Sequence, residues 1–294
     1  MVRPACAVLG GGVSGLTSAL KLLEAGWDVH MVAKEIAGTG PVALPSSSLA
    51  CGLVSQGAGG LWEYPPYKVE PAEQAGRWAL ETLAPLQALA AAPDETGVRT
   101  RRANVLFRRR PRDWEESARA LRAVLPGYAE MASDTLPGHA AAHLRHGYAF
   151  DAPVCFMPLY LAWLRRSCVD MGAHLHSGVR LTSLQHASSL HAQLQSLLPQ
   201  DAPRLSLVVN CLGLANRALN GDMAMVPVRG ALVHVHCPEV QQVFMDEDDA
   251  TLADGLATYV IPQAFGLVAC GGTGHEGQWS EQVSREEASA ILSR

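Results

Sequence analysis

Residues 7–35 read AVLGGGVSGLTSALKLLEAGWDVHMVAKE, and this stretch decides the fold class. A short apolar run that ends at Leu9 is typical of a buried strand, and the spacing Gly10-x-Gly12-x-x-Gly15 follows it directly. Leucines at helical spacing then predict a helix with one apolar face, and a second apolar run predicts another strand. The chain is therefore expected to open with a strand, a glycine turn, a helix and a second strand.

This glycine spacing is typical of a site that holds a dinucleotide. Gly10 allows a tight turn, Gly12 lets the backbone approach a pyrophosphate, and Gly15 lets the helix pack closely on the strand. The expected helix begins at Val13 and Ser14, where unpaired amides and the positive end of the helix dipole face the phosphates. The sequence therefore predicts that these five residues bind phosphate.

The end of the second strand carries the polar residues Lys34 and Glu35. An acid at this position can accept hydrogen bonds from a ribose, and Glu35 lies twenty residues after Gly15. The motif alone does not decide between NAD and FAD, so both remain alternatives at this point.

Composition excludes several classes of protein. The chain has 294 residues, which is enough for one large core or two modest domains. Its net charge of -5 argues against nucleic acid or an anionic membrane surface as the main partner. The seven cysteines include no C-x-x-C, so we expect neither a disulfide framework nor a zinc site. No apolar run reaches the roughly 18 residues of a membrane span, and no signal peptide is expected.

Seven arginines lie between Arg99 and Arg112, and acidic residues follow them directly. A basic patch for nucleic acid is one interpretation, and a solvated edge strand with its loop is the other. The acidic flank and the negative net charge favour the second interpretation, so no nucleic-acid partner is expected.

Two histidine pairs, His174 with His176 and His234 with His236, have the spacing that puts both side chains on one face of a strand. No third ligand with metal spacing is evident near either pair. The sequence therefore predicts solvated strand faces and no metal site.

Two further segments bear on the cofactor. Residues 57–62 form a second glycine cluster, where small residues would let the backbone lie against a flat ring, although a simple loop is the alternative. Residues 205–209 predict another buried strand. Pairing of this strand beside the first would bring Gly213 near the cofactor.

At this point the chain resembles the D-amino-acid oxidases and D-aspartate oxidases. Six segments in the same order carry the resemblance: Val8–Leu16, Gly57–Trp62, Gly147–Leu161, Val208–Gly213, Pro227–Gly230 and Tyr259–Trp279. The resemblance covers nearly the whole chain, and six ordered segments are far more specific than one.

The resemblance implies FAD as the cofactor. It places Gly59, Gly60 and Leu61, beside Trp62, at the isoalloxazine ring. It also implies an α/β fold in which a Rossmann-type FAD-binding domain is joined to a mixed-sheet substrate domain, both discontinuous in sequence. We place the FAD-binding domain at residues 1–62 and 148–220, and the substrate domain at residues 63–147 and 221–294.

The resemblance also implies contacts for the rest of the cofactor. It places Val54 and Ser55 on the pyrophosphate side, and Leu181, Leu212 and Gly213 beside the adenine half and the ribose.

The implied chemistry is the oxidation of a D-amino acid by dioxygen. Hydride passes from the substrate α-carbon to flavin N5, and the products are a 2-oxo acid, ammonia and hydrogen peroxide. Tyr259 matches the family's tyrosine whose hydroxyl binds the substrate carboxylate. The resemblance implies no nucleic-acid or membrane partner, leaves a homodimer open, and suggests the cytoplasm or the peroxisome, although the chain has no Ser-Lys-Leu ending.

The chain departs from the family pattern at its C-terminus. Family members continue further, and that part carries the arginine that clamps the substrate carboxylate and the last strand of the cofactor sheet. The sequence is therefore expected to be truncated, and the alternative function is an incomplete relative that binds flavin without full activity.

The last residues of the sequence support the expected truncation. Ser284 to Glu287 form a capping box that predicts a final helix with no partner to pack on. Arg229 and Arg285 are the nearest candidates to replace the missing arginine. The favoured interpretations are a structural arginine at the start of a strand for Arg229 and an exposed residue in the first helical turn for Arg285.

Overall fold

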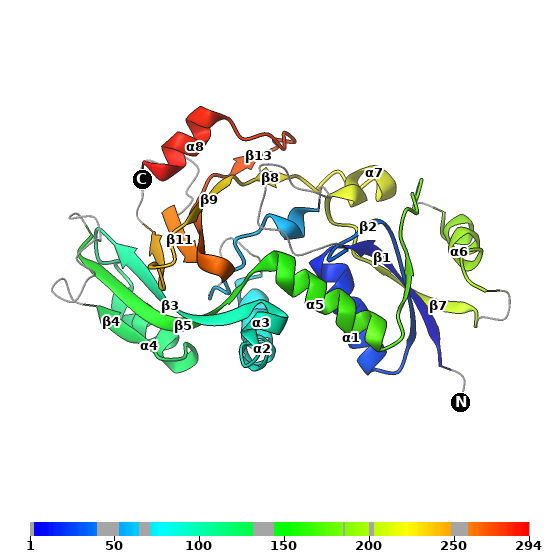
Figure 1. Cartoon of the computed structure of the whole chain (residues 1–294), viewed down its shortest axis with the longest axis horizontal. Helices are drawn as coiled ribbons and strands as arrows, with labels where there is room; N and C mark the ends of the chain where they lie inside the picture. The colour runs from blue at the N-terminus through cyan, green and yellow to red at the C-terminus, as the bar shows by residue number, and fades with distance from the viewer. Residues whose placement is uncertain are drawn as a thin grey trace. The chain divides into compact units, whose positions relative to one another are not determined.

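The computed structural model describes residues 3–39, 53–64, 71–131, 144–184, 186–199, 203–247 and 258–293. The chain divides into two compact units (Figure 1). The first consists of Met1–Ala58 and Met157–Pro227, and the second consists of Gly59–Phe156 and Val228–Arg294. These units divide the chain after Ala58, Phe156 and Pro227, whereas the expected domain boundaries fall after residues 62, 147 and 220. The assignment of domains to cofactor and substrate stays a prediction.

The first unit is built on a parallel sheet with the strand order β6-β2-β1-β7. Its elements are β1 (Ala5–Gly11), α1 (Val13–Glu24), β2 (Asp28–Ile36), η1 (Val54–Gln56), α5 (Met157–Asp170), β6 (His174–His176), α6 (Ala187–Gln195), β7 (Leu205–Asn210), η2 (Gly213–Ala215) and α7 (Asn216–Asn220). The β1–α1–β2 order and the parallel pairing confirm the Rossmann-type fold predicted from the first 35 residues.

Strand β1 is buried along its whole length because helices pack against this sheet. Ala5, Ala7 and Leu9 of β1 form a cluster with Leu194 of α6 and Leu198 just beyond it. Helix α1 contacts β1 and β2 and lies beside α5 (Figure 1). Since alternate strand residues face opposite sides, α1 and α6 cover opposite faces of the sheet.

Strand β7 corrects one expectation. It pairs with β1, as predicted, but only Leu205 is buried, while Leu207 and Val208 are each 36% exposed. The physical reason is its position, because β7 is the edge strand of the four described strands and is covered less than β1.

The second unit is built on a seven-stranded mixed sheet with the order β4-β5-β3-β10-β11-β12-β9. Its elements are α2 (Ala72–Leu89), α3 (Pro93–Thr96), β3 (Val98–Phe107), α4 (Trp114–Val124), β4 (Ala129–Met131), β5 (His146–Cys155), β8 (Val228–Arg229), β9 (Leu232–His236), β10 (Val243–Asp246), β11 (Thr258–Pro262), η3 (Ala264–Gly266), β12 (Leu267–Gly271), β13 (His275–Glu276) and α8 (Arg285–Leu292). The pair β3–β10 is parallel and the other pairs of this sheet are antiparallel, which confirms the predicted mixed sheet.

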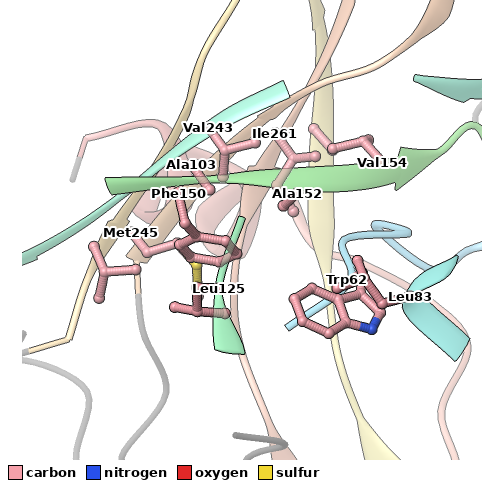
Figure 2. Packing of buried hydrophobic residues seen from close by; sticks show 12 residues of the cluster. Trp62, Leu83, Ala103, Leu125, Phe150, Ala152, Val154, Val243, Met245 and Ile261 are labelled. Carbon is pink, nitrogen blue, oxygen red and sulfur yellow. The ribbon is translucent and has the colours of Figure 1, made fainter. Parts of the chain in front are cut away.

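The core of this unit lies between the sheet and α2. Figure 2 shows Trp62 and Leu83 beside side chains of the sheet that include Phe150, Val154 and Ile261. The indole Nε1 of Trp62 donates a hydrogen bond to the backbone oxygen of Ala79 at 2.9 Å. The Trp62 side chain is therefore a core residue of the second unit.

The arginine-rich stretch corrects a second expectation. Strand β3, which carries Arg99, Arg101 and Arg102, is an interior strand between β5 and β10 and not an edge strand. Of the acids that follow the arginines, Glu115 pairs with Arg110 at 2.6 Å, as expected. Arg99 and Arg102 pair with acids outside that flank, Asp94 and Asp151.

The final helix corrects a third expectation, namely that this helix has no partner to pack on. Helix α8 begins as predicted, because the Ser284 side chain accepts a hydrogen bond from the Glu287 amide at 3.1 Å. The helix has partners, since it contacts β9 and β12 and buries Ile291.

Among the residues that the structure describes, no helix has the length and apolar content that crossing a bilayer requires.

Candidate cofactor and substrate site

The glycine turn between β1 and α1 is closed by backbone contacts. Gly10 has a φ of 111°, and a Cβ there would lie 2.3 Å from the carbonyl oxygen of Cys211. A Cβ on Gly15 would lie 2.0 Å from the carbonyl oxygen of Gly10. Only glycine fits at these two positions, and the contact between Gly10 and Gly15 is the close approach of helix and strand that the motif predicts.

The start of α1 has room for a phosphate. Gly12 is the N-cap, and among the described residues a Cβ there would meet only the Ser55 hydroxyl, at 3.0 Å. The amide of Val13 donates to that same hydroxyl at 3.0 Å, while Ser14 is exposed and Val54 is 72% exposed. An anion that takes the place of the Ser55 hydroxyl would meet a helix N-terminus with no acidic side chain in its first turn. The residues of this turn therefore fit a pyrophosphate.

The carboxyl end of β2 lies beside the same turn, because the Ala37 amide donates to the carbonyl oxygen of Gly11 at 2.8 Å. Lys34 and Glu35 are located there and form an ion pair with 2.9 Å between Nζ and Oε1. Both side chains reach solvent, so Glu35 is available to a ribose and Lys34 lies beside it as a cation.

Two backbone segments border these residues. The amides of Gly178 and Val179 donate to the carbonyl oxygens of Lys34 and Ala33, at 3.0 and 3.1 Å, which brings the segment that carries Leu181 to the end of β2. Leu181 packs against the cluster that α6 covers.

The segment after β7 reaches the glycine turn from the other side. The Cys211 amide donates to the carbonyl oxygen of Leu9 at 2.8 Å, and the Leu212 amide nitrogen would lie 3.3 Å from a Cβ on Gly10. Gly213 follows with a φ of 55° and opens η2. The first unit therefore brings the turn, Lys34, Glu35, Leu212 and Gly213 together, while their contacts with a cofactor remain a prediction.

The second unit contains the residues assigned to the flavin ring and the substrate. The carbonyl oxygen of Gly60 accepts a hydrogen bond from the Cys155 amide of β5 at 2.8 Å. Leu61 forms an antiparallel β-bridge with Val154 of the same strand. A Cβ on Gly59 would lie 3.2 Å from Cδ1 of Ile261 on β11. The glycine cluster is therefore an extended segment held along β5 and against β11.

Tyr259 lies on β11 and is half-buried. Its ring rests on β12, where a Cβ on Gly271 would lie 2.2 Å from the Tyr259 Cζ. Burial raises the pKa of Tyr259, so its hydroxyl stays protonated at neutral pH and can donate a hydrogen bond. A Cβ on Gly59 would lie 4.0 Å from the Tyr259 Cε2, which places the glycine cluster beside the tyrosine.

One residue of this neighbourhood was missed by the sequence analysis. The buried side chain of Gln263 donates from Nε2 to the carbonyl oxygen of Gly59 at 3.1 Å, and its Oε1 lies 3.1 Å from His234 Nε2. It holds the glycine cluster in place. A glutamine directly after Pro262 carries no signal in the sequence, because its burial depends on pairing between distant strands.

Arg229 is held by structural partners. It forms two hydrogen bonds with Glu287, Nη1 to Oε1 at 2.7 Å and Nη2 to Oε2 at 2.8 Å, and a third with the Gln282 carbonyl oxygen. The guanidinium is therefore committed to α8 and the segment before it, which agrees with the structural interpretation that we favoured.

The β1–α1–β2 unit, its glycine turn and the helix end facing it define an α/β dinucleotide-binding protein. Comparison with known families identifies the class more closely. The chain belongs to the family of FAD dependent oxidoreductases, whose model matches residues 5–294, so it is an oxidoreductase and its cofactor is FAD.

Within this family the chain is similar to amino acid oxidases. It is 32% identical to a D-amino-acid oxidase from Rubrobacter xylanophilus over 98% of this chain and 74% of that protein. It is 34% identical to a D-amino-acid oxidase from Streptomyces coelicolor, over 98% and 75%. The chain spans about three quarters of the length of both relatives.

The fold is similar to that of glycine oxidase from Geobacillus kaustophilus. The TM-score is 0.71 at 17% sequence identity, over 100% of this chain and 77% of the other. This likeness confirms the α/β architecture with its mixed sheet.

Proposed function

We propose that the protein is an FAD-dependent oxidase of D-amino acids. The observation that carries the proposal is the identity of 32–34% to two D-amino-acid oxidases over 98% of the chain. The glycine turn and the position of Tyr259 beside the glycine cluster support it.

The residues of each unit have separate tasks in this proposal. The amides at the start of α1 bind the diphosphate, and Glu35 accepts hydrogen bonds from the ribose. The backbone of Gly59, Gly60 and Leu61 packs on the flavin ring, while the Tyr259 hydroxyl donates to the substrate carboxylate. Bound FAD supplies the hydride acceptor and is returned to its oxidised form by dioxygen, which yields hydrogen peroxide.

The balance of the reaction follows from this arrangement. The amino acid loses two electrons and its α-hydrogen as hydride, and water hydrolyses the resulting imino acid to a 2-oxo acid and ammonia. Positioning by the protein accounts for the rate, because the α-carbon must approach the hydride acceptor in one orientation.

The proposal is tested on the purified full chain reconstituted with excess FAD. Peroxide formed from D-alanine and D-aspartate is measured against L-alanine as the control. The proposal predicts flavin binding and peroxide from at least one D-amino acid. Absence of bound flavin contradicts it, and flavin binding without turnover favours the alternative of an incomplete relative.

A pair of variants tests Tyr259. Tyr259→Phe removes one hydrogen bond to a charged group, which is worth about 1.5–3 kcal/mol. We therefore expect kcat/KM to fall by about 10- to 100-fold with unchanged flavin content. Tyr160→Phe, in the first unit, is the matched control and should leave kcat/KM unchanged.

Two expectations concern assembly and location. A homodimer stays an expectation, which sedimentation of the purified protein measures. Both D-amino-acid oxidases compared above, which match 98% of the chain, are bacterial, so we do not propose the peroxisome.

A further inference from the structure

One face of the first unit's sheet gathers histidine and carboxylate side chains. Strand β6 pairs in parallel with β2 so that His174 lies opposite His30 and His176 opposite Val32. Residues two apart in a strand share a face, so Asp28, His30, His174 and His176 all point to the same side. The two histidines that looked solvent-facing in the sequence therefore meet a third histidine and an acid.

The distances within this cluster suit a shared cation. Asp28 lies between two imidazoles, with Oδ1 3.3 Å from His174 Nε2 and Oδ2 3.7 Å from His30 Nε2. One ligand atom from each of Asp28, His30 and His174 lies within 4.8 Å of the others. Bonds of about 2.0–2.2 Å to a tetrahedral metal separate ligand atoms by roughly 3.3 Å, so the shell closes when the exposed His174 ring turns out of its stack on His30.

A buried nitrogen of the cluster has no hydrogen bond within the described part of the chain. The His30 side chain is 2% exposed, and its Nε2 is buried without a hydrogen-bond partner among the described residues. Its other nitrogen, Nδ1, lies 3.1 Å from His176 Nε2. When Nδ1 is the donor in that contact, the lone pair of Nε2 faces the Asp28 carboxylate, an arrangement that a cation between them would stabilise.

The cluster is also open to solvent on the side of His174. His174 is 53% exposed and its ring stacks on His30 with 4.5 Å between centroids, so an ion can enter and His174 can turn toward it.

We propose that Asp28, His30 and His174 form a binding site for a divalent transition-metal ion of the Zn²⁺ class, with His176 orienting His30. Two imidazoles and one carboxylate are ligands that this class of ion prefers, and water completes the shell. The bound ion ties the three-residue strand β6 to β2. This site is separate from the proposed oxidase chemistry, because Asp28 begins β2 whereas Lys34 and Glu35 lie at its other end.

The test is calorimetric titration with Zn²⁺ alone. The full chain, with its bound flavin and freed of metal by a chelator, is compared with Asp28→Asn and His174→Ala. Both residues reach solvent, so these variants are expected to fold. His236→Ala, an exposed histidine in the second unit, is the matched control. We expect about one Zn²⁺ per chain, binding weakened by about tenfold or more in both cluster variants, and no change in the control.

Thermal unfolding provides a second readout, since an ion that binds only the folded chain raises the Tm. Zn²⁺ should raise the Tm of the unmodified chain and of His236→Ala, and Asp28→Asn should lose this effect. Absence of stoichiometric binding, or equal binding by both cluster variants, overturns the proposal. Either outcome is independent of oxidase activity, because neither readout uses turnover.

Discussion

Alanine variants of two glycines in the turn after β1 distinguish an effect on folding from an effect on cofactor binding. A Gly15→Ala side chain would lie 2.0 Å from the Gly10 carbonyl oxygen, so we expect a loss of about 1–3 kcal/mol or more in unfolding free energy. Within the parts of the chain that the structure describes, a Gly12→Ala side chain meets only the Ser55 hydroxyl, so the stability of this variant should stay near that of the unmodified chain. Because the new methyl group would occupy the place of the pyrophosphate, FAD binding should weaken.

Urea unfolding and quenching of flavin fluorescence measure these two effects. Gly15→Ala serves as the control for folding. If Gly12→Ala binds FAD as tightly as the unmodified chain, the pyrophosphate does not approach the backbone at Gly12.

Glu63 is a partly buried acid whose effect on stability depends on pH. Burial, with a further contribution from the charge of Glu247, raises the pKa of Glu63 to about 7. An acid whose pKa is raised in the folded state is most favourable when protonated, so its contribution is lost as the pH rises from its usual pKa toward 7. Glu63→Gln should therefore be more stable than the unmodified chain at pH 8, by up to about 3 kcal/mol, with little difference below pH 4.

Chemical unfolding at both pH values measures this difference. The exposed Glu276→Gln is the control and should show no such pH dependence. Equal stability of Glu63→Gln and the unmodified chain at pH 8 would show that the Glu63 carboxylate is well solvated.

At the scale of single residues, the roles that could be predicted are those of residues inside a local motif. Gly10, Gly12 and Gly15 could be assigned because their spacing along the chain carries the information. Gln263 and Glu63 could not, since the burial of Gln263 and the desolvation of Glu63 arise from segments far apart in the sequence.

At the scale of elements, α8 is anchored by an ion pair. The hydrogen bond from Arg229 is the main reason why the pKa of Glu287 lies below its usual range. An acid with a lowered pKa contributes stability above its ordinary pKa and loses it as the pH falls through the folded value. Glu287→Gln should therefore be less stable at pH 7, by about 1–3 kcal/mol for the hydrogen bonds to a charged group, and the deficit should disappear in acid.

Unfolding followed by circular dichroism from pH 7 to pH 3 measures this change. Asp94→Asn removes an exposed partner of Arg99 and is the control, with an expected effect under about 1 kcal/mol. A deficit that persists in acid would mean that the glutamine disturbs packing and not charge.

Elements formed by neighbouring residues could be predicted, and their neighbours in the sheets could not. The motif specified β1, α1 and β2 because all three lie within one short stretch. The pairing of β6 with β2 joins residues 30 and 174, and no periodicity in the sequence indicates this pairing. The same limit explains why β3 was expected at an edge and why the cluster around His30 was missed.

At the scale of the whole molecule, FAD should act as a folding ligand. FAD at about 100 times its Kd adds about 2.7 kcal/mol to the unfolding free energy if it binds only the folded chain. We expect the Tm to rise by several degrees with FAD and by less with FMN, which lacks the adenosine half assigned to the first unit. Differential scanning fluorimetry without added dye, read from tryptophan emission, measures both shifts. Equal shifts with FAD and FMN would contradict the dinucleotide assignment.

The strand order of the first unit's sheet also determines how long β1 waits for one of its neighbours during biosynthesis. Ala5 of β1 pairs with Leu205 of β7, two hundred residues further along the chain. A ribosome that adds about 5–20 residues per second needs about 10–40 s to bridge that distance. For that time the nascent β1 lacks one of its neighbours, so chaperones that shield apolar nascent chain should influence the yield of this protein more than its equilibrium stability.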